Sequence, residues 1–123
     1  MGDDITFEFD NNTPIYLQLI ECLKIYIISG KLEPGKRIPS VRDLALLIKV
    51  NPNTVQKALE KLEEMKLIYT KRTNGKFVTE DFSLINKLKE EYADEITKIY
   101  FEKMQNIGFE KIDTMKYLDK ERK

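Results

Sequence analysis

Several residue types are scarce in this chain, and each shortage argues against a class of protein. The chain has no histidine and one cysteine, Cys22, so a histidine general base, a zinc site of cysteine and histidine ligands and an internal disulfide are not expected. Its five glycines form no glycine-rich phosphate loop, and no apolar run approaches the roughly 18 residues of a membrane span. We therefore expect no enzyme, no cofactor or metal, and no membrane association.

The N-terminal residues and the single cysteine support two further predictions, one on the location of the protein and one on the role of the thiol. Met-Gly-Asp-Asp at the N-terminus has neither the basic region nor the apolar stretch of a secretory signal, which predicts a cytoplasmic protein. Cys22 has apolar neighbours and no basic residue beside it to lower its pKa, so a buried structural thiol is favoured over a redox sensor. Paired carboxylates such as Glu90 and Glu91 lie near lysines, which is typical of solvated helix surfaces.

The formal net charge is zero, but the charges are unevenly distributed. Residues 34–80 carry ten basic and five acidic side chains, whereas residues 1–33 carry two basic and six acidic ones, and residues 81–123 carry nine and ten. Positive charge therefore gathers in the middle of the chain. Such a local excess is typical of a surface that binds nucleic acid.

Two helix starts lie close together in this basic segment. Ser40 directly precedes apolar residues at helical spacing, so its hydroxyl is placed to cap a helix. Asn51 is a favoured capping residue, and Pro52 follows at the first helical position, where its missing amide costs nothing. Only about three residues separate the two predicted helices, which is the connection expected of a helix-turn-helix.

The second of these helices, predicted over residues 51–65, has an apolar and a polar face. The apolar face follows the i, i+3, i+4, i+7 pattern that packs on a core, and the residues at its N-terminal end that point outward are types that bind base edges and phosphates. Glu60 and Glu64 lie farther along, and phosphates would repel them, so the N-terminal turns should meet DNA. Any one of the polar residues alone is more ordinarily solvated surface; their grouping at a capped start favours binding.

A basic β-hairpin is predicted after this helix. The runs 67–72 and 76–79 are prone to form strands and are joined through Thr73-Asn74-Gly75, in which Asn-Gly favours a hairpin turn. Lys71, Arg72 and Lys76 gather near the tip, which suits a phosphate backbone or the minor groove. A solvated basic turn is the alternative, and the neighbouring helix-turn-helix favours binding.

Taken in order, these motifs resemble the winged-helix DNA-binding domain of the GntR family of bacterial transcription regulators. The matching pieces are Pro14-Ile15-Tyr16, the run GKLEPGKRIPSVRDLA over 30–45, NPNTVQKA over 51–58, and Gly75-Lys76-Phe77-Val78. The Asn-Pro-Asn-Thr turn and the short remainder resemble the YtrA-like branch of that family.

The resemblance also implies site residues. It places phosphate and base contacts at Arg42, at the start of the 51–65 helix and at the wing glycine region, which correspond to Asn53, Thr54, Gln56, Lys57 and Gly75. Many relatives carry arginine where this chain has Asn53 and Gln56, so we expect a different operator sequence.

Helices are predicted on both sides of the winged helix. Thr13 is placed to cap a helix that begins at Pro14 and ends at Gly30, and the alternation over 5–9 weakly indicates an additional strand. A long helix is predicted from Ser83 to Asn106, and a shorter one follows Gly108. The apolar stripes expected on these helices comprise Ile15, Leu19, Ile20, Leu23 and Ile27 before the winged helix, and Ile112, Met115 and Leu118 in the last helix.

Two helices after the wing cannot enclose a core by themselves, so we expect their apolar stripes to meet a second copy of the chain. The alternative is that they fold back on their own winged helix. They leave little room for a ligand pocket of roughly 300 Å³ or more, so an unknown small-molecule effector would bind at the dimer interface, between the domains, or not at all. The predicted interface residues are Leu88, Tyr92, Ile96, Ile99, Tyr100 and Met104.

The sequence thus predicts a mostly α fold with a small β-hairpin: a winged helix-turn-helix domain over 1–80 and a two-helix C-terminal dimerisation or effector region over 81–123. The predicted function is sequence-specific transcription regulation, by a dimeric repressor that binds a palindromic double-stranded DNA operator through helix 51–65 and wing 71–78. A winged helix that contacts only proteins is the alternative.

Lys36 and Arg37 either reach a flanking phosphate or stay solvated. The candidate DNA-binding residues are Arg37, Ser40, Arg42, Asn51, Asn53, Thr54, Gln56, Lys57, Arg72, Thr73, Asn74, Gly75 and Lys76.

Overall fold

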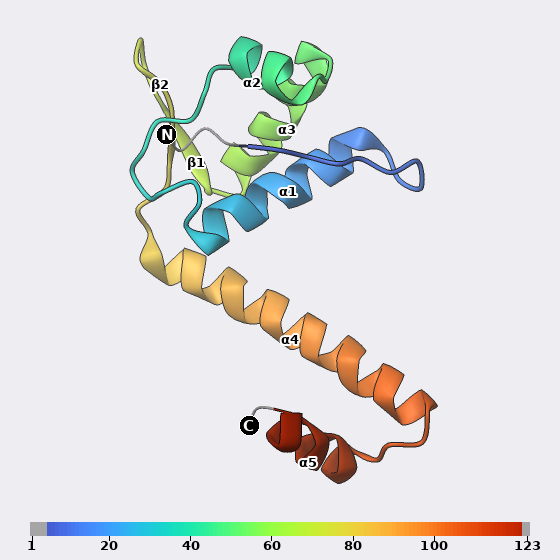
Figure 1. Ribbon diagram of the computed structural model, residues 1–123. Coiled ribbons are helices and arrows are strands. Elements are labelled where there is room, and N and C mark those ends of the chain that lie inside the picture. Colours follow the sequence, from blue (N-terminus) through green and yellow to red (C-terminus); the bar gives the residue numbers. More distant parts are fainter. Residues whose placement is uncertain (1–4, 122–123) are drawn as a thin grey trace. The chain divides into compact units, whose positions relative to one another are not determined.

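The computed structural model describes residues 5–121, so the residues on which the prediction of a missing secretory signal rests lie outside the described part (Figure 1). The chain divides into two compact units, residues 1–86 and 87–123. The predicted fold class, mostly α with one small hairpin, is confirmed. Within 5–121 the element order is α1 (Ile15–Ser29), α2 (Val41–Ile48), α3 (Pro52–Glu64), β1 (Ile68–Lys71), β2 (Gly75–Val78), α4 (Phe82–Asn106) and α5 (Lys111–Glu121).

Helix α1 ends where the sequence predicted but begins differently. Gly30 terminates it in the left-handed conformation, with φ 87°, which glycine adopts without strain. Pro14 is its N-cap and makes no side-chain capping bond, so the predicted Thr13 cap is wrong. Instead, the Gln18 side chain donates to the carbonyl oxygens of Thr13 at 2.7 Å and Asp10 at 3.0 Å. The Gln18 side chain, from within α1, therefore fixes the segment that leads into the helix.

The residues before α1 form no strand over positions 5–10. Ile5 is buried, the Thr6 amide donates to the Tyr26 hydroxyl at 3.0 Å, and the Phe7 ring lies 5.5 Å from that of Phe9 and 6.0 Å from that of Tyr26. The weakly indicated strand is therefore wrong, because these alternating residues pack on α1 instead of pairing with a sheet.

Both predicted starts of the helix-turn-helix are confirmed. The Ser40 hydroxyl accepts from the Asp43 amide at 3.1 Å, and the Asn51 side chain accepts from the Asn53 amide at 2.7 Å. Lys49 ends α2 with φ 58°, which turns the chain into α3. Each cap pairs one orphan amide in the first turn of its helix, so the turn between the helices is fixed by local chemistry.

The core of the first unit lies between α1, α3, α2 and the hairpin, since α1 and α2 pack on α3 and α3 packs on β1. Ile15, predicted to belong to the buried stripe of α1, is 44% exposed, because it lies at the first position of the helix. The other members of the stripe are buried. The largest fully buried side chains of this core are Leu19, Ile27, Leu44, Val55, Leu59, Leu62, Leu67, Ile68 and Val78.

The hairpin pairs β1 with β2 in antiparallel register, with Lys71 opposite Gly75. Its turn is therefore Arg72–Asn74, closed by the Asn74 amide donating to the Lys71 carbonyl at 3.0 Å, and Gly75 belongs to β2 instead of to the predicted Asn-Gly turn. The chain before α2 borders the other edge of β2. The Ile38 amide donates to the Lys76 carbonyl, and the Val78 amide donates to the Lys36 carbonyl, both at 2.9 Å.

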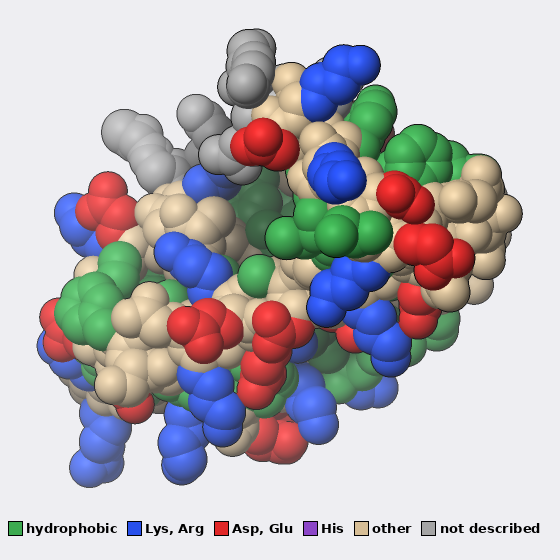
Figure 2. Space-filling model, turned by 90° about the horizontal axis from the view of Figure 1, so that it is seen from below, with side chains coloured by type: hydrophobic (Ala, Val, Ile, Leu, Met, Phe, Trp, Pro, Cys, Tyr) green, Lys and Arg blue, Asp and Glu red, His purple; other side chains and the backbone are tan. Residues whose placement is uncertain are grey.

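The second unit contains most of α4 and all of α5. The predicted end of the long helix at Asn106 is confirmed, and Gly108 follows with φ 104°. No helix within residues 5–121 is long and apolar enough to cross a membrane. Hydrophobic side chains reach the surface between charged ones on the face seen in Figure 2. The exposed large apolar residues of the unit are Ile96, Ile99, Ile107, Ile112, Met115 and Tyr117, so the predicted stripe of α5 is exposed at two of its three positions.

An open cleft of about 500 Å³ lies along the second unit, lined by Phe101 and Gln105 of α4, by Phe109 and by Met115 of α5. Because this cleft is open to solvent, it does not test the expectation that two helices leave little room for an enclosed ligand pocket. The helices enclose no core between them, and the space stays open along their length.

Candidate nucleic-acid interface

The N-terminal turns of α3 separate polar from apolar residues as the sequence predicted. Asn53, Gln56 and Lys57 are exposed and Thr54 is half-buried, whereas Val55, two residues beyond Asn53, is fully buried. The apolar side of α3 anchors the helix to the core, and the opposite side presents an amide-rich, basic surface. This surface has the chemistry needed to bind adenine edges and phosphates.

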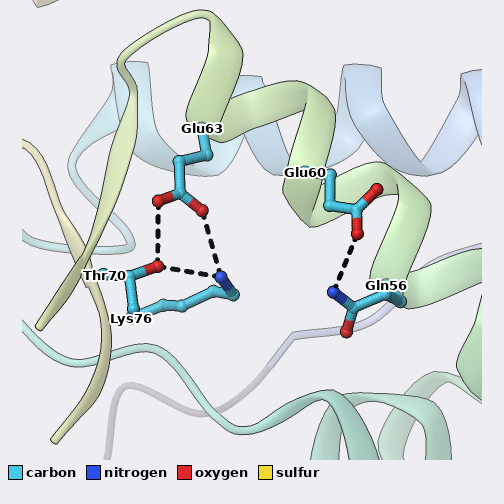
Figure 3. Close-up of polar contacts among 5 residues, drawn as sticks. All are labelled: Gln56, Glu60, Glu63, Thr70 and Lys76. Atoms are coloured by element: carbon cyan, nitrogen blue, oxygen red, sulfur yellow. Dashed lines mark hydrogen bonds and ion pairs between the residues drawn. The ribbon is translucent and has the colours of Figure 1, made fainter. Parts of the chain in front are cut away.

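Two of these side chains are already oriented within the protein. The Gln56 amide donates to the Glu60 carboxylate at 3.1 Å, which keeps it along the helix and leaves one amide hydrogen and the carbonyl oxygen for another partner (Figure 3). The Lys57 ammonium lies 5.7 Å from the centre of the Tyr16 ring, within range of a cation–π contact. The bond to Glu60 was not expected from the sequence, although its spacing of four residues is a signal for it.

The capping residues retain hydrogen-bond donors. Ser40 and Asn51 use their side-chain oxygens as acceptors for helix amides, so the Ser40 hydroxyl hydrogen and the Asn51 amide hydrogens stay available. Both residues are exposed, as is Arg42 in the first turn of α2. The first turns of α2 and α3 thus present donors of the kind that bind phosphate oxygens.

The tip of the wing is exposed at Arg72, Thr73 and Asn74. Arg37 reaches this tip from the chain before α2, and its Nε donates to the Asn74 carbonyl at 2.8 Å. Gly75 has φ 103°, which favours glycine, and a Cβ there would lie 2.7 Å from the same Nε, so a larger residue would displace the Arg37 side chain. The sequence left Arg37 as a phosphate contact or a solvated residue, and its support of the wing was missed.

Lys76 is not at the free tip. Its ammonium donates to the Glu63 carboxylate at 3.1 Å and to the Thr70 hydroxyl at 2.9 Å, and the Thr70 hydroxyl donates to the other Glu63 oxygen at 2.9 Å (Figure 3). The Lys76 hydrogen bond holds the pKa of Glu63 below its usual range. Glu63 and Thr70 were missed because the sequence gives no register between a helix and a hairpin.

Metal-ligating groups and the single thiol are the other features of the described residues that could carry chemistry. Among residues 5–121 there is no group of three or more Cys, His, Asp and Glu side chains that could hold a metal ion. Cys22 is half-buried, and burial raises the pKa of its thiol against the smaller opposing effect of the Lys31 charge. Cys22 is therefore less buried than the sequence predicted, and its structural role stays a prediction.

Comparison with known proteins gives the family. A family model described as bacterial regulatory proteins, gntR family, matches residues 15–78. The chain is 32% identical over 104 residues to YhcF of Bacillus subtilis, an uncharacterized HTH-type transcriptional regulator, with 85% of this chain and 86% of that protein covered. It is 44% identical over 71 residues to the HTH-type transcriptional repressor YtrA of the same organism, with 58% and 55% covered.

Solved structures agree with this assignment. A GntR family transcriptional regulator from Listeria monocytogenes matches with a TM-score of 0.81 and 37% identity, over 91% of this chain and 98% of that one. AraR(DBD) in complex with operator ORX1 matches with a TM-score of 0.53 and 27% identity, over 60% and 94%. The matched family is one of regulators, not of enzymes. The chain therefore belongs to the GntR family of bacterial regulatory proteins and is a DNA-binding transcription regulator, as the sequence predicted.

Proposed function

We propose that this regulator is a homodimeric repressor that acts in the bacterial cytoplasm and binds a palindromic operator. The N-terminal turns of α3 enter the major groove, and the wing over 71–78 lies along the flanking backbone. The observation that carries the proposal is the polar start of α3, exposed at Asn53, Gln56 and Lys57 while the opposite face is buried. AraR(DBD), a similar fold, has been solved on operator DNA, and YtrA is named a repressor.

The proposed contacts divide by chemistry. Asn53, Gln56 and Thr54 read base edges, because amides pair with the adenine edge and a threonine methyl contacts thymine. The sequence-independent contacts go to phosphates and come from charged side chains, from the donors left on the capping residues and from the turn of the wing. Of the two remaining predicted residues, Arg37 is bonded to the tip of the wing and Lys76 to Glu63 of α3 and to Thr70. The proposed phosphate contacts are Ser40, Arg42, Asn51, Lys57, Arg72, Thr73, Asn74 and Gly75.

The second unit supports the dimer part of the proposal. Ile96 is 65% and Ile99 42% exposed, and both lie on the stripe predicted to meet another copy. Burial of such a stripe against its symmetry mate removes apolar surface from water on both chains. Two recognition helices then read half-sites about one DNA turn apart. The open cleft of about 500 Å³ gives space for an unknown small-molecule effector.

The test is selection of bound duplexes from a random pool by the full chain. We expect an inverted repeat whose half-site centres lie about 10 base pairs apart or a multiple of that. Gln56→Ala should relax the preference at one position of each half-site by about 1–3 kcal/mol. A pool that is not enriched over its input would contradict the proposal.

A matched pair of lysines on α3 tests which end of the helix meets DNA. Lys57 lies near the N-terminal end, and Lys61, one turn later, is paired with Glu64 at 3.7 Å. Lys57→Ala should reduce affinity for the selected duplex and flatten its salt dependence, whereas Lys61→Ala should leave both unchanged. Equal losses in the two variants would contradict the proposed orientation.

A further inference from the structure

A polar triangle joins the last turn of α3 to the middle of the wing. Thr70 and Lys76 are opposite each other in the hairpin register, and both contact Glu63 of α3. The Thr70 hydroxyl donates to Glu63 and accepts from Lys76, so each contact of the triangle fits the donor and acceptor roles of its partners (Figure 3).

This ion pair differs from the others in what it connects. The pairs Lys24–Glu21, Lys36–Glu33 and Lys61–Glu64 join residues three positions apart, whereas Lys76 and Glu63 are thirteen positions apart, on different elements. The Lys76 side chain is 22% exposed and that of Glu63 38%. Two of the three ammonium hydrogens of Lys76 are used inside the protein.

We propose that Glu63, Thr70 and Lys76 form a clamp that fixes the wing against the recognition helix, and that Lys76 is a positioning residue for the wing instead of a phosphate contact. The proposal rests on the function proposed above, because the position of the wing matters only if the wing meets DNA. A two-stranded hairpin is marginally stable by itself, so its direction depends on what holds it.

The other edge of the wing is held separately. Arg37 donates to the Asn74 carbonyl at the tip, and the chain on either side of it exchanges hydrogen bonds with β2. The clamp therefore acts on the side of the hairpin that faces α3, while the segment around Arg37 supports the edge of β2. Loss of the clamp should loosen the wing without unfolding it.

The first arm of the test measures the wing without DNA. Amide hydrogen exchange of β1 and β2 is compared in the full chain, in Lys76→Met, in the uncharged change Thr70→Val, and in Arg72→Met as the control at the exposed tip. We expect exchange about two- to fivefold faster in the first two variants and unchanged in the control. A Thr70→Val or Lys76→Met wing that exchanges at the wild-type rate would overturn the proposal.

The second arm measures affinity for the duplex selected from the random pool, as a function of salt. A positioning role predicts that Lys76→Met and Thr70→Val both weaken binding two- to fivefold with the salt slope unchanged. Arg72→Met should instead reduce the slope by about one. If Lys76→Met reduces the slope as Arg72→Met does, Lys76 contacts phosphate directly and the proposal is overturned.

The two arms separate the clamp from the proposed function. If the wild-type chain binds no duplex, the proposed function fails and the exchange measurement alone decides whether the clamp exists. If the chain binds but the Thr70 and Lys76 variants exchange normally, the clamp fails and the function stands. The double variant Lys76→Met with Thr70→Val should exchange faster than either single variant, because Lys76→Met leaves the Thr70–Glu63 hydrogen bond and Thr70→Val leaves the Lys76–Glu63 ion pair.

Discussion

The two units of this chain differ in how their helices are stabilised. In the first unit α3 is fully buried along one face by α1, α2 and the hairpin, whereas in the second unit, among the described residues 87–120, Thr114 alone is buried. The difference teaches that the winged helix supplies its own core, whereas the described part of the second unit encloses almost no buried side chains.

The largest effect should come from the core of the first unit. Leu59 is 1% exposed, so Leu59→Ala should lower the free energy of unfolding by about 2–5 kcal/mol, through lost burial and the cavity left behind. Urea denaturation measures this. Leu46→Ala is the matched control, because Leu46 is 73% exposed and its truncation should change stability by less than about 0.5 kcal/mol. Similar losses in both variants would contradict the comparison.

The second unit should respond in assembly instead of in folding. Ile96→Glu places a charge on the stripe proposed to face a second copy, and it should weaken the dimer by about 2 kcal/mol or more. Sedimentation across a concentration series measures the shift to monomer. Leu46→Glu, at a site in the first unit that is 73% exposed against 65% for Ile96, should leave the dimer intact. A wild-type chain that is monomeric at micromolar concentration would contradict the dimer outright.

A pair of glycines, one in each unit, sharpens the comparison further. Gly75 and Gly108 both have positive φ, 103° and 104°, so alanine at either should lower stability by about 1–2 kcal/mol. A Cβ at Gly75 also meets Arg37, whereas nothing lies within 4 Å of one at Gly108. Gly75→Ala should therefore lose about 0.5–1.5 kcal/mol more in thermal unfolding, for the Arg37–Asn74 bond. Equal losses would show that Arg37 moves aside freely.

The smallest effect is a pH dependence in the wing. Because the folded pKa of Glu63 is lowered, its pairing stabilises the fold above the ordinary glutamate pKa of about 4.3, and this contribution is lost as pH falls through the folded value. The stability difference between the wild type and Glu63→Gln should shrink from pH 7 to pH 3. It should stay below about 1 kcal/mol, since the pair is partly solvated. A difference that grows on acidification would have the wrong sign.

Much of the fold could be predicted because it is encoded locally. Ser40, Asn51 and Gly30 act within four residues of their own positions, so their roles in starting and ending helices are visible in the sequence. The predicted Thr13 cap is wrong because α1 begins one residue later, at Ile15, which puts Pro14 at the cap position, and the Thr13 carbonyl is bound by Gln18, five residues along. The strand weakly indicated over 5–9 is wrong because Thr6 bonds to the hydroxyl of Tyr26, twenty residues away, instead of pairing with another strand.

The candidate site shows the same division. Periodicity was enough to place Asn53, Gln56 and Lys57 on the outer face of α3, because one helix fixes all three. The contacts of Arg37 and Lys76 join separate elements, and no spacing in the sequence reports how a hairpin packs on a helix. The sequence predicts DNA contacts for both residues, and only the packed structure reveals that their donors are engaged within the protein.

The bond between Gln56 and Glu60 has a thermodynamic consequence for recognition. A free glutamine samples many rotamers, and fixing one of them at a base edge opposes association. In this protein the Gln56 rotamer is already restricted in the folded state, by the hydrogen bond to the Glu60 carboxylate one turn away. In the proposed complex the Gln56 amide meets its base edge preorganised, and we expect discrimination between operators to depend less on ordering entropy than on the fit of the hydrogen bonds themselves.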